Sequence, residues 1–473
     1  MFAVLAKAES SRIGSIKYFR GRSSRGDSKL YTSATYDELV RDVNLHYTDF
    51  LIKRNPGLVE AAVQLHQSGQ IPPNTYLLDL DAHRRNAREI ARHAKKAGLS
   101  LYYMSKQVGR NPLICKGVLD EGFRGVVAVE VQCAKSLHRY GIKIGHVGHL
   151  VQPPVDDIDY VLSMDPEVWT VYSTENARMV SKRAEKRNRR QDVLVQPVAK
   201  GDLFFDTMSG GIPEEDLVEE VRKISKLPGV RVVGTTSFPC LLFNLASGRV
   251  EPISNFHTAV RGARRLEKEL GLEVTQVNVP GTNHASNMKL IAENGGTHAE
   301  PGNGVSGTNT EHGFDAKAPE IPAFVYVTEV SHQLGERLFT QGGGMSYSGG
   351  GWGLFPNGKL WVAGSDVSMD AMVGRSGREA ISNRVKAKYP GMDPFNYNLT
   401  LYPGSKKFPT GATVVFGFCT VQIFVTRGWH AVVEGIEENR PRLLGIFDQG
   451  NNLVDRKGRL QGEKAVRDLL ERV

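Results

Sequence analysis

From about residue 75 to about residue 310 the chain alternates short apolar runs with longer amphipathic stretches. This alternation is typical of repeated strand–helix units, in which parallel strands are buried on both faces. Helices are predicted at 82–97, with Asp81 as a candidate N-cap and Gly98 as the stop, and at 213–226 and 254–270. The predicted strands are 75–81, 99–106, 125–131, 144–152, 167–173, 192–199, 231–238, 274–281 and 297–302. Eight or nine such repeats favour a (β/α)8 barrel over an open doubly wound sheet, because no GxGxxG follows an early strand.

After about residue 310 the pattern changes to β-branched and alternating runs separated by glycine-rich turns. The runs at 323–332, 359–364, 412–428 and 430–436 predict a separate, mostly β domain. The domain organisation expected from these patterns is a basic extension at 1–70, a barrel at 71–310 and a C-terminal β domain at 311–473. We expect the extension to pack on the β domain or on a partner.

The formal net charge is +9, and residues 1–30 carry seven Lys or Arg side chains against two acidic ones. We interpret this stretch as a basic arm that contacts another subunit; an organelle-targeting segment or a site for an anionic partner is the alternative. The basic stretch 181–190 continues a helical pattern and is predicted as a solvated helix face. Nucleic acid is therefore not an expected partner.

The four cysteines, Cys115, Cys133, Cys240 and Cys419, lie far apart and lack metal-ligand spacing. This usage predicts no zinc site and no disulfide framework, and it favours a reducing, cytoplasmic compartment. No apolar run approaches the ~20 residues that span a bilayer, so no membrane association is expected.

Lys106 ends the predicted strand "LSLYYMSK", and in a barrel the C-terminal strand ends carry the active site. Taken alone, this lysine is most simply a side chain that extends its ammonium group to solvent. The alternative is that partial desolvation lowers its pKa, so that the neutral amine forms a Schiff base with a carbonyl cofactor.

Two later strand ends favour the second interpretation. "EPGNG" at 300–304 combines a carboxylate with two glycines, and "VPGTNHASN" at 279–287 offers a tight turn before a helix at 285–293. Such turns expose backbone N–H groups that can hold a phosphate. A strand-end lysine, a phosphate turn and a nearby glutamate are what pyridoxal 5′-phosphate requires, namely an imine partner, a phosphate anchor and a ring-nitrogen partner.

The stretch "TYLLDLDAHRRNAREIARHAKKAGLSLYYMSKQVGRNP" resembles the N-terminal signature of fold-type III pyridoxal-phosphate enzymes, the superfamily of alanine racemase and of ornithine and diaminopimelate decarboxylases. "AEPG" at 299–302 is similar to the decarboxylase motif "EPGR", "VQCAKSL" to "CASxxE", and "GFCTVQ" to "GAYT", with Cys419 where tyrosine is usual. The likeness covers about residues 74–440 and is closest to a branch of poorly characterised alanine-racemase-like amino-acid racemases. The residues that match the N-terminal signature are Asp79, Leu80, Asp81, Asn86 and Lys106.

The resemblance implies that Lys106 forms the Schiff base, that Glu300 pairs with the pyridine nitrogen and that Gly302 lies near the phosphate. Gly281 and Thr282 are further candidates for the phosphate. Ser237 is a candidate for holding the phosphate or the ring, and the alternative is a structural role. His146 and His149 flank a strand end, and one of them, His149 being our candidate, either stacks on the cofactor or is a core histidine.

Racemisation, or epimerisation, of an amino acid is the leading prediction for the reaction. It removes the α-proton on one face, where Lys106 serves, and returns it on the other, which in this superfamily is served from the β domain of the partner subunit. Candidates for that second group are Tyr347, His332 and Cys419, and a homodimer with shared active sites is expected. The alternative is a pyridoxal-phosphate-dependent lyase or decarboxylase of the D-amino-acid aldolase or dehydratase type. No "CDxxD" segment and no His-x-Cys pair occurs after residue 310, so a metal is not expected.

Overall fold

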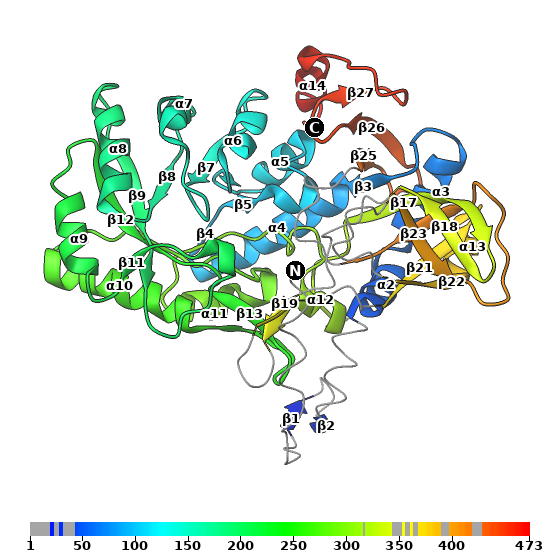
Figure 1. Ribbon diagram of the computed structural model, residues 1–473, viewed down its shortest axis with the longest axis horizontal. Helices are drawn as coiled ribbons and strands as arrows, with labels where there is room; N and C mark the ends of the chain where they lie inside the picture. The colour runs from blue at the N-terminus through cyan, green and yellow to red at the C-terminus, as the bar shows by residue number, and fades with distance from the viewer. Residues whose placement is uncertain are drawn as a thin grey trace.

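The computed structural model places two domains side by side (Figure 1). The first domain carries the cyan and green elements on the left of the view, and the yellow and orange strands of the second lie on the right. The structure describes residues 19–22, 28–31, 43–315, 317–342, 352–354, 360–362, 368–388, 397–418 and 428–473. The side chains of the basic arm, and the candidates Tyr347 and Cys419, lie outside the described residues.

Eight parallel strand segments form a closed barrel, as the sequence predicts. β4 (Ser100–Leu101) pairs with β16 (His298–Ala299), whereas β5 (Tyr103–Met104) pairs with β6 (Val126–Ala128). Because β4 and β5 are two halves of one extended segment, the ladder closes on itself and the (β/α)8 barrel is confirmed. The other strands, in ladder order, are β7 (Ile144–Val147), β8 (Val168–Val171), β9 (Gln191–Val195), β12 (Val230–Thr236) and β15 (Gln276–Asn278).

Apolar side chains fill the barrel and cover its outer face. A buried cluster from alternate positions of the strands occupies the interior: Tyr102, Met104, Val127, Val168, Leu194 and Val233. A larger cluster packs the outer face of the strands against a ring of helices. These helices are α4 (Leu80–Ala97), α5 (Pro112–Leu119), α6 (Val131–His138), α7 (Ile158–Ser163), α8 (Thr174–Glu185), α9 (Leu217–Ile224), α10 (Ser254–Leu270) and α11 (Met288–Glu293).

The predicted end of α4 is confirmed, but its predicted N-cap is wrong. Gly98 ends the helix in a left-handed conformation, with φ of 73°. At the other end Asp79, and not Asp81, accepts the N–H of Ala82 at 3.1 Å. The Asp81 carboxylate instead accepts the N–H of Gly435 in the second domain, a contact that no local pattern could indicate.

The second domain is a mostly antiparallel β structure, as predicted. β17 (Phe324–Leu334) pairs with β24 (Thr413–Phe416) and, through its far half, with β18 (Arg337–Gln341). Since β18 also leads back to β24 through the intervening strands, six strands close into a small barrel. The strands between them are β23 (Asn398–Tyr402), β22 (Arg384–Lys388) and β21 (Ser368–Gly374), and the sheet continues through β3 (Thr75–Asp79), β25 (Trp429–Glu434), β26 (Arg442–Phe447) and β27 (Leu453–Val454).

The strand predicted at 75–81 does not belong to the first barrel, which is a correction. β3 pairs antiparallel with β17, Tyr76 opposite Tyr326, and parallel with β25, Ala431 opposite Leu77. All five β3 residues are buried, and a strand that is covered on both faces has the same apolar sequence pattern in either sheet. The run therefore reveals a buried strand but not which sheet receives it.

Two helices from the predicted extension pack on the second domain. They are α2 (Val43–Arg54) and α3 (Pro56–Gln67), and Leu58, Val59 and Val63 of α3 share a buried cluster with Val325 and Val415. The remaining elements are β1 (Phe19–Arg22), β2 (Ser28–Tyr31), β10 (Pro197–Val198), β11 (Ile212–Pro213), β13 (Leu241–Asn244), β14 (Arg249–Pro252), β19 (Trp352–Leu354), β20 (Leu360–Val362), α12 (Thr310–Phe314), α13 (Gly377–Ser382), α14 (Glu463–Leu470) and the 3-10 turns η1 (Ser105–Val108), η2 (Val155–Asp157), η3 (Asp206–Met208) and η4 (Ala285–Asn287). In the described part of the chain, no helix combines the length and the apolar character needed to cross a membrane.

Candidate active site

Lys106 lies at the C-terminal end of the first barrel strand, in the turn η1 that follows β5 directly. Its side chain is 8% exposed, and its Nζ lies 5.7 Å from the centroid of the Phe238 ring. Among the described residues no carboxylate forms an ion pair with it. Burial therefore lowers the pKa of Lys106 to about 8, although Cys133 and Glu300 partly oppose the shift. A neutral, nucleophilic amine is thus accessible near neutral pH.

Glu300 follows β16 at the same end of the barrel and is held by two neighbouring strands. Its Oε1 accepts hydrogen bonds from Nδ1 of His146 on β7 at 2.5 Å and from Nδ2 of Asn278 on β15 at 2.6 Å. Burial alone would raise the pKa of Glu300, but the His149 and His146 rings and these hydrogen bonds lower it to about 2. The carboxylate is therefore ionised, and its Oε2 is buried with no hydrogen-bond partner in the described chain.

His149 reaches this carboxylate through a glycine turn. Gly148 has φ of 74°, and a Cβ on it would lie 2.5 Å from the carbonyl oxygen of Thr170, so only glycine fits the turn after β7. His149 Nε2 lies 3.6 Å from Glu300 Oε2, and neither nitrogen of this buried ring has a hydrogen-bond partner among the described residues. Burial lowers the pKa of His149 to about 4, so the ring is neutral. Unpaired, buried polar atoms of this kind are expected where a ligand supplies the partners.

Backbone N–H groups for an anion are available in the turn that follows Glu300. The N–H groups of Gly302, Gly304 and Val305 donate to no acceptor in the described part of the chain. The carbonyls of the same turn are used, since Gly302 accepts from Ser306 and Gly304 accepts from Gly307. Residues 302–305 thus present donors like the open start of a helical turn, which suits a phosphate.

The other predicted phosphate positions are placed differently. In the loop after β15, the N–H groups of Thr282, Asn283, His284 and Ala285 already donate to Leu241, Gly281, Asn287 and Glu320. A Cβ on Gly281 would lie 2.6 Å from the Leu241 nitrogen, so this glycine is needed for packing against β13. The Thr282 hydroxyl is buried without a hydrogen-bond partner in the described residues and stays available. Ser237 is buried directly after β12 and precedes Phe238, whose ring lies 5.7 Å from Lys106 Nζ.

Of the three candidates for the second acid–base group, only His332 lies within the described residues. It is exposed on the half of β17 that pairs with β18, its ring stacks on Phe339 at 4.7 Å, and its Nδ1 bonds with the Ser331 hydroxyl. No described contact joins it to Lys106 within one chain.

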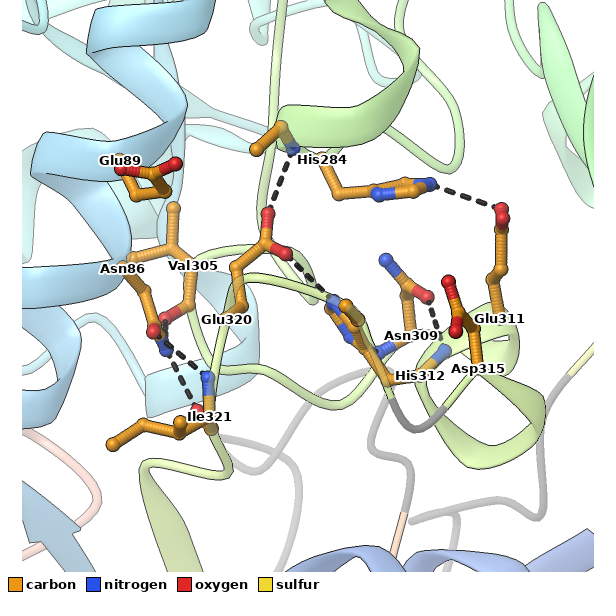
Figure 2. A network of polar contacts seen from close by, with 12 residues as sticks. Asn86, Glu89, His284, Val305, Asn309, Glu311, His312, Asp315, Glu320 and Ile321 are labelled. Atoms are coloured by element: carbon orange, nitrogen blue, oxygen red, sulfur yellow. Dashed lines mark hydrogen bonds and ion pairs between the residues drawn. The ribbon is translucent and has the colours of Figure 1, made fainter. Parts of the chain in front are cut away.

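A second group of buried ionisable side chains lies next to the loop after β15 (Figure 2). His284 Nε2 donates to Glu311 at 3.1 Å, and His312 Nε2 donates to Glu320 at 3.1 Å. Glu320 also accepts the Ala285 N–H at 2.7 Å. Nearby, Asn86 of α4 bonds to Ile321 and to the carbonyl of Val305. The segment 309–321, which connects the two domains, is therefore tied to the start of η4 and to α4.

Each of these two sites contains two histidines and a glutamate close enough to surround a metal ion. The hydrogen-bond directions argue against this use. His312 Nδ1 accepts the N–H of Asn309 at 3.1 Å, so its hydrogen is on Nε2, where a metal would need a lone pair. His146 likewise directs Nδ1–H to Glu300, and its Nε2 contacts the Thr170 hydroxyl at 2.6 Å. We interpret both groups as hydrogen-bonded His–carboxylate pairs.

Two residues that position Glu300 were missed in the sequence. Asn278 lies inside the predicted strand 274–281, and only the structure, in which β15 ends at Asn278, places it at a strand end. Thr170 lies inside the predicted strand 167–173, and only the folded barrel brings its hydroxyl to His146. Phe238, which lies beside both Lys106 and His149, was also missed, because an aromatic residue after a strand has many structural uses.

Two family models and several known proteins match this chain. Residues 78–309 match the alanine racemase N-terminal domain, and residues 325–443 match the YhfX-like C-terminal domain. The uncharacterised protein YhfX of Escherichia coli K12 is 33% identical over 408 residues, which cover 86% of this chain and 99% of that protein.

Solved structures share the fold at low identity. D-Threonine aldolase from Filomicrobium marinum matches with a TM-score of 0.56 and 15% identity, over 80% of this chain and 95% of that one. D-threo-3-hydroxyaspartate dehydratase from Delftia sp. HT23 matches with a TM-score of 0.54 and 14% identity, over 80% of this chain and 97% of that one. Alanine racemase from Clostridium difficile 630 matches with a TM-score of 0.52 and 12% identity, over 79% of this chain and 98% of that one.

Barrel, β domain and matches together define a protein of the fold-type III, alanine-racemase-like superfamily. The 33% identity to YhfX of Escherichia coli, over most of both chains, is more specific evidence of family than the shared fold is. The chain belongs to the YhfX family.

Proposed function

We propose that this protein is a pyridoxal 5′-phosphate-dependent amino-acid racemase or epimerase. The observation that carries the proposal is the pairing, at one end of the barrel, of a buried lysine with a pKa near 8 and an ionised, buried glutamate. Burial makes the amine available in its neutral form near neutral pH, whereas the hydrogen-bonded carboxylate stays ionised, as a general base and an electrostatic partner require.

The described residues fit this cofactor. Lys106 supplies the amine for its aldehyde, Glu300 Oε2 is free to accept from its protonated ring nitrogen, and the N–H groups of Gly302, Gly304 and Val305 suit its phosphate. When bound, the cofactor delocalises the electron pair left at the substrate α-carbon. The His146 and Asn278 hydrogen bonds hold Glu300 ionised, which keeps a facing ring nitrogen protonated.

Racemisation needs one proton-transferring group on each face of the substrate. Lys106 Nζ takes or gives the proton on one face, and its pKa of about 8 allows both states near neutral pH. The group on the opposite face is proposed to be Tyr347, with His332 and Cys419 as further candidates, supplied by a second copy of the chain. We therefore also propose a homodimer in which each active site contains residues of both subunits.

The first prediction tests the attachment point and the reaction together. Wild-type protein mixed with pyridoxal 5′-phosphate should develop the visible absorbance of a lysine-bound aldehyde, and Lys106→Ala should not. Single-enantiomer amino acids incubated with the loaded protein in deuterated water should gain α-deuterium and yield the opposite enantiomer. The matched control is Lys96→Ala on α4, which should keep the band. A band that persists in Lys106→Ala would contradict the assignment.

The competing function is a lyase acting on a similar substrate. Structural neighbours with aldolase and dehydratase activity share this fold, so the fold does not separate these reactions. Release of an aldehyde, ammonia or carbon dioxide without formation of the opposite enantiomer would favour the lyase and overturn racemisation.

A further inference from the structure

Gln107, the residue after Lys106, has a buried amide without a hydrogen bond. The side chain is 5% exposed, and its Oε1 is buried with no partner in the described chain. Its Nε2 forms no hydrogen bond with a described residue either, and this nitrogen is accessible rather than fully buried, so it can donate to a ligand. A phosphate offers acceptors only, so it is the Nε2 donor of this amide, and not its carbonyl oxygen, whose bonding such a ligand would complete.

The amide of Gln107 lies flat against the backbone of Gly302. A Cβ on Gly302 would be 2.4 Å from Gln107 Oε1, 2.7 Å from Cδ and 2.9 Å from Nε2, so only glycine permits this contact. The amide therefore borders the turn whose N–H groups at Gly302, Gly304 and Val305 have no acceptor. The Gln107 Nε2 and these three N–H groups are neutral donors that lie along the same short turn.

The arrangement fits the two functional ends of the proposed cofactor. Its aldehyde and its phosphate-bearing arm are attached to adjacent ring carbons, so neighbouring residues of one turn can serve both. Lys106 faces Phe238 and Glu300, whereas the Gln107 side chain faces Gly302. In this chain Asn303 stands where the resembling motif has arginine, so no cation from that position is available to the phosphate.

We propose that Gln107 is a phosphate-binding residue, whose amide donates to the phosphate of the cofactor beside the Gly302–Val305 turn. This inference rests on the proposed function, since it assumes that Lys106 binds the cofactor aldehyde. It predicts a phosphate subsite built from neutral donors only. A negative charge introduced at residue 107 should therefore repel the phosphate strongly.

The test compares pyridoxal 5′-phosphate with pyridoxal, which has the same aldehyde and ring but no phosphate. Both are titrated into cofactor-free full-length protein, and binding is followed by the visible band of the lysine-bound aldehyde. Gln107→Glu, which is isosteric, should weaken binding of pyridoxal 5′-phosphate at least about tenfold by charge repulsion and change that of pyridoxal less than about twofold. Gln107→Leu, which only removes the donor, should weaken pyridoxal 5′-phosphate about fivefold.

The matched control is Gln191→Glu, the same change at a buried glutamine at the opposite end of the barrel strands, in β9. It should alter the affinity for neither compound, and thermal unfolding of each variant shows whether it is folded. If Gln107→Glu is unfolded, the Gln107→Leu comparison decides. Equal effects on both compounds, or none on either, would overturn the role of Gln107. Failure of the wild-type protein to bind either compound through Lys106 would instead overturn the proposed function.

Discussion

At the scale of single residues, the protein buries several histidines in the neutral state. Burial lowers the pKa of four imidazoles to about 4: His83, His149, His298 and His430. An unfolded histidine has a pKa near 6.5, so the unfolded chain binds protons that the folded protein does not accept. Between pH 6.5 and pH 4 these groups therefore favour unfolding as the pH falls. Asp79, whose pKa burial raises to about 7, acts in the opposite direction over this range, but it is one group against four.

The second prediction is that the free energy of unfolding decreases as the pH is lowered from 6.5 to 4. Urea unfolding at several pH values measures it. His430→Leu removes one of the four groups, and neither nitrogen of His430 has a hydrogen-bond partner in the described chain, so the variant should show a shallower pH dependence. His257→Gln, at an exposed position on α10, should leave the slope unchanged. A free energy of unfolding that stays constant or increases as the pH is lowered from 6.5 to 4 would contradict the neutral state assigned to the buried histidines.

At the scale of elements, the segment 309–321 holds the loop after β15 to the domain junction. Glu320 is fully buried and bonds both His312 and the first N–H of η4. Burial alone would raise the pKa of Glu320, but His312, with its hydrogen bond, and His284 lower it to about 2. Apart from the short helix α12, the described part of the segment is held by these polar contacts. Because Glu320 is buried and ionised, replacing it with a neutral acceptor weakens both of its hydrogen bonds.

The third prediction concerns this tie. Glu320→Gln should lower the free energy of unfolding by about 2 kcal/mol, because it replaces a buried, ionised acceptor of two hydrogen bonds with a neutral amide. Denaturant unfolding of the purified variant measures the loss. Glu329→Gln offers a matched control, since Glu329 also pairs with a buried histidine, His66, but is 30% exposed. Its cost should stay below about 1 kcal/mol. Equal losses in the two variants would show that burial of the pair does not matter.

At the scale of the whole molecule, two domains that share one continuous apolar cluster are interleaved along the chain. The strand β3 belongs to the second domain, yet α4, which begins at the next residue, belongs to the barrel. The junction runs through Asp79, Asn86 and the 309–321 segment rather than through a flexible linker. The relative position of the two domains is thereby constrained, as a site built from both would require.

The fourth prediction tests whether active sites are shared between subunits. Lys106→Ala and Tyr347→Phe, each inactive alone, should regain activity when the two are unfolded and refolded together. Random pairing places one intact site in half of the dimers, so about one quarter of wild-type racemisation is expected. Size-exclusion chromatography with light scattering confirms the dimer. Absence of any recovery in a mixed dimer would contradict a second base contributed by the partner.

Lys106 and Glu300 were predicted at strand ends, which a barrel gathers on one face, but their roles came from the resemblance to fold-type III enzymes, because a strand-end lysine alone is most simply a solvated side chain. Regular alternation of apolar runs and helices was likewise enough for the barrel, and β-branched runs for the second domain. The cap of α4 was not predictable, since Asp79 and Asp81 are both suitable capping residues. Only the contact of Asp81 with Gly435 distinguishes them.

The amino-acid sequence alone thus determined the two fold classes and their order, which follow from periodicity within short stretches, and its resemblance to a known superfamily predicted the roles of Lys106 and Glu300. The tertiary structure decided which sheet receives β3, which N–H groups remain free for an anion, and that Gln107 lies on Gly302. These features depend on pairs of residues far apart in the chain, such as Tyr76 with Tyr326 and Gln107 with Gly302. A local sequence pattern indicates which side chains of a segment are buried. Only the closed barrel and the packed second domain determine which other residues those side chains contact.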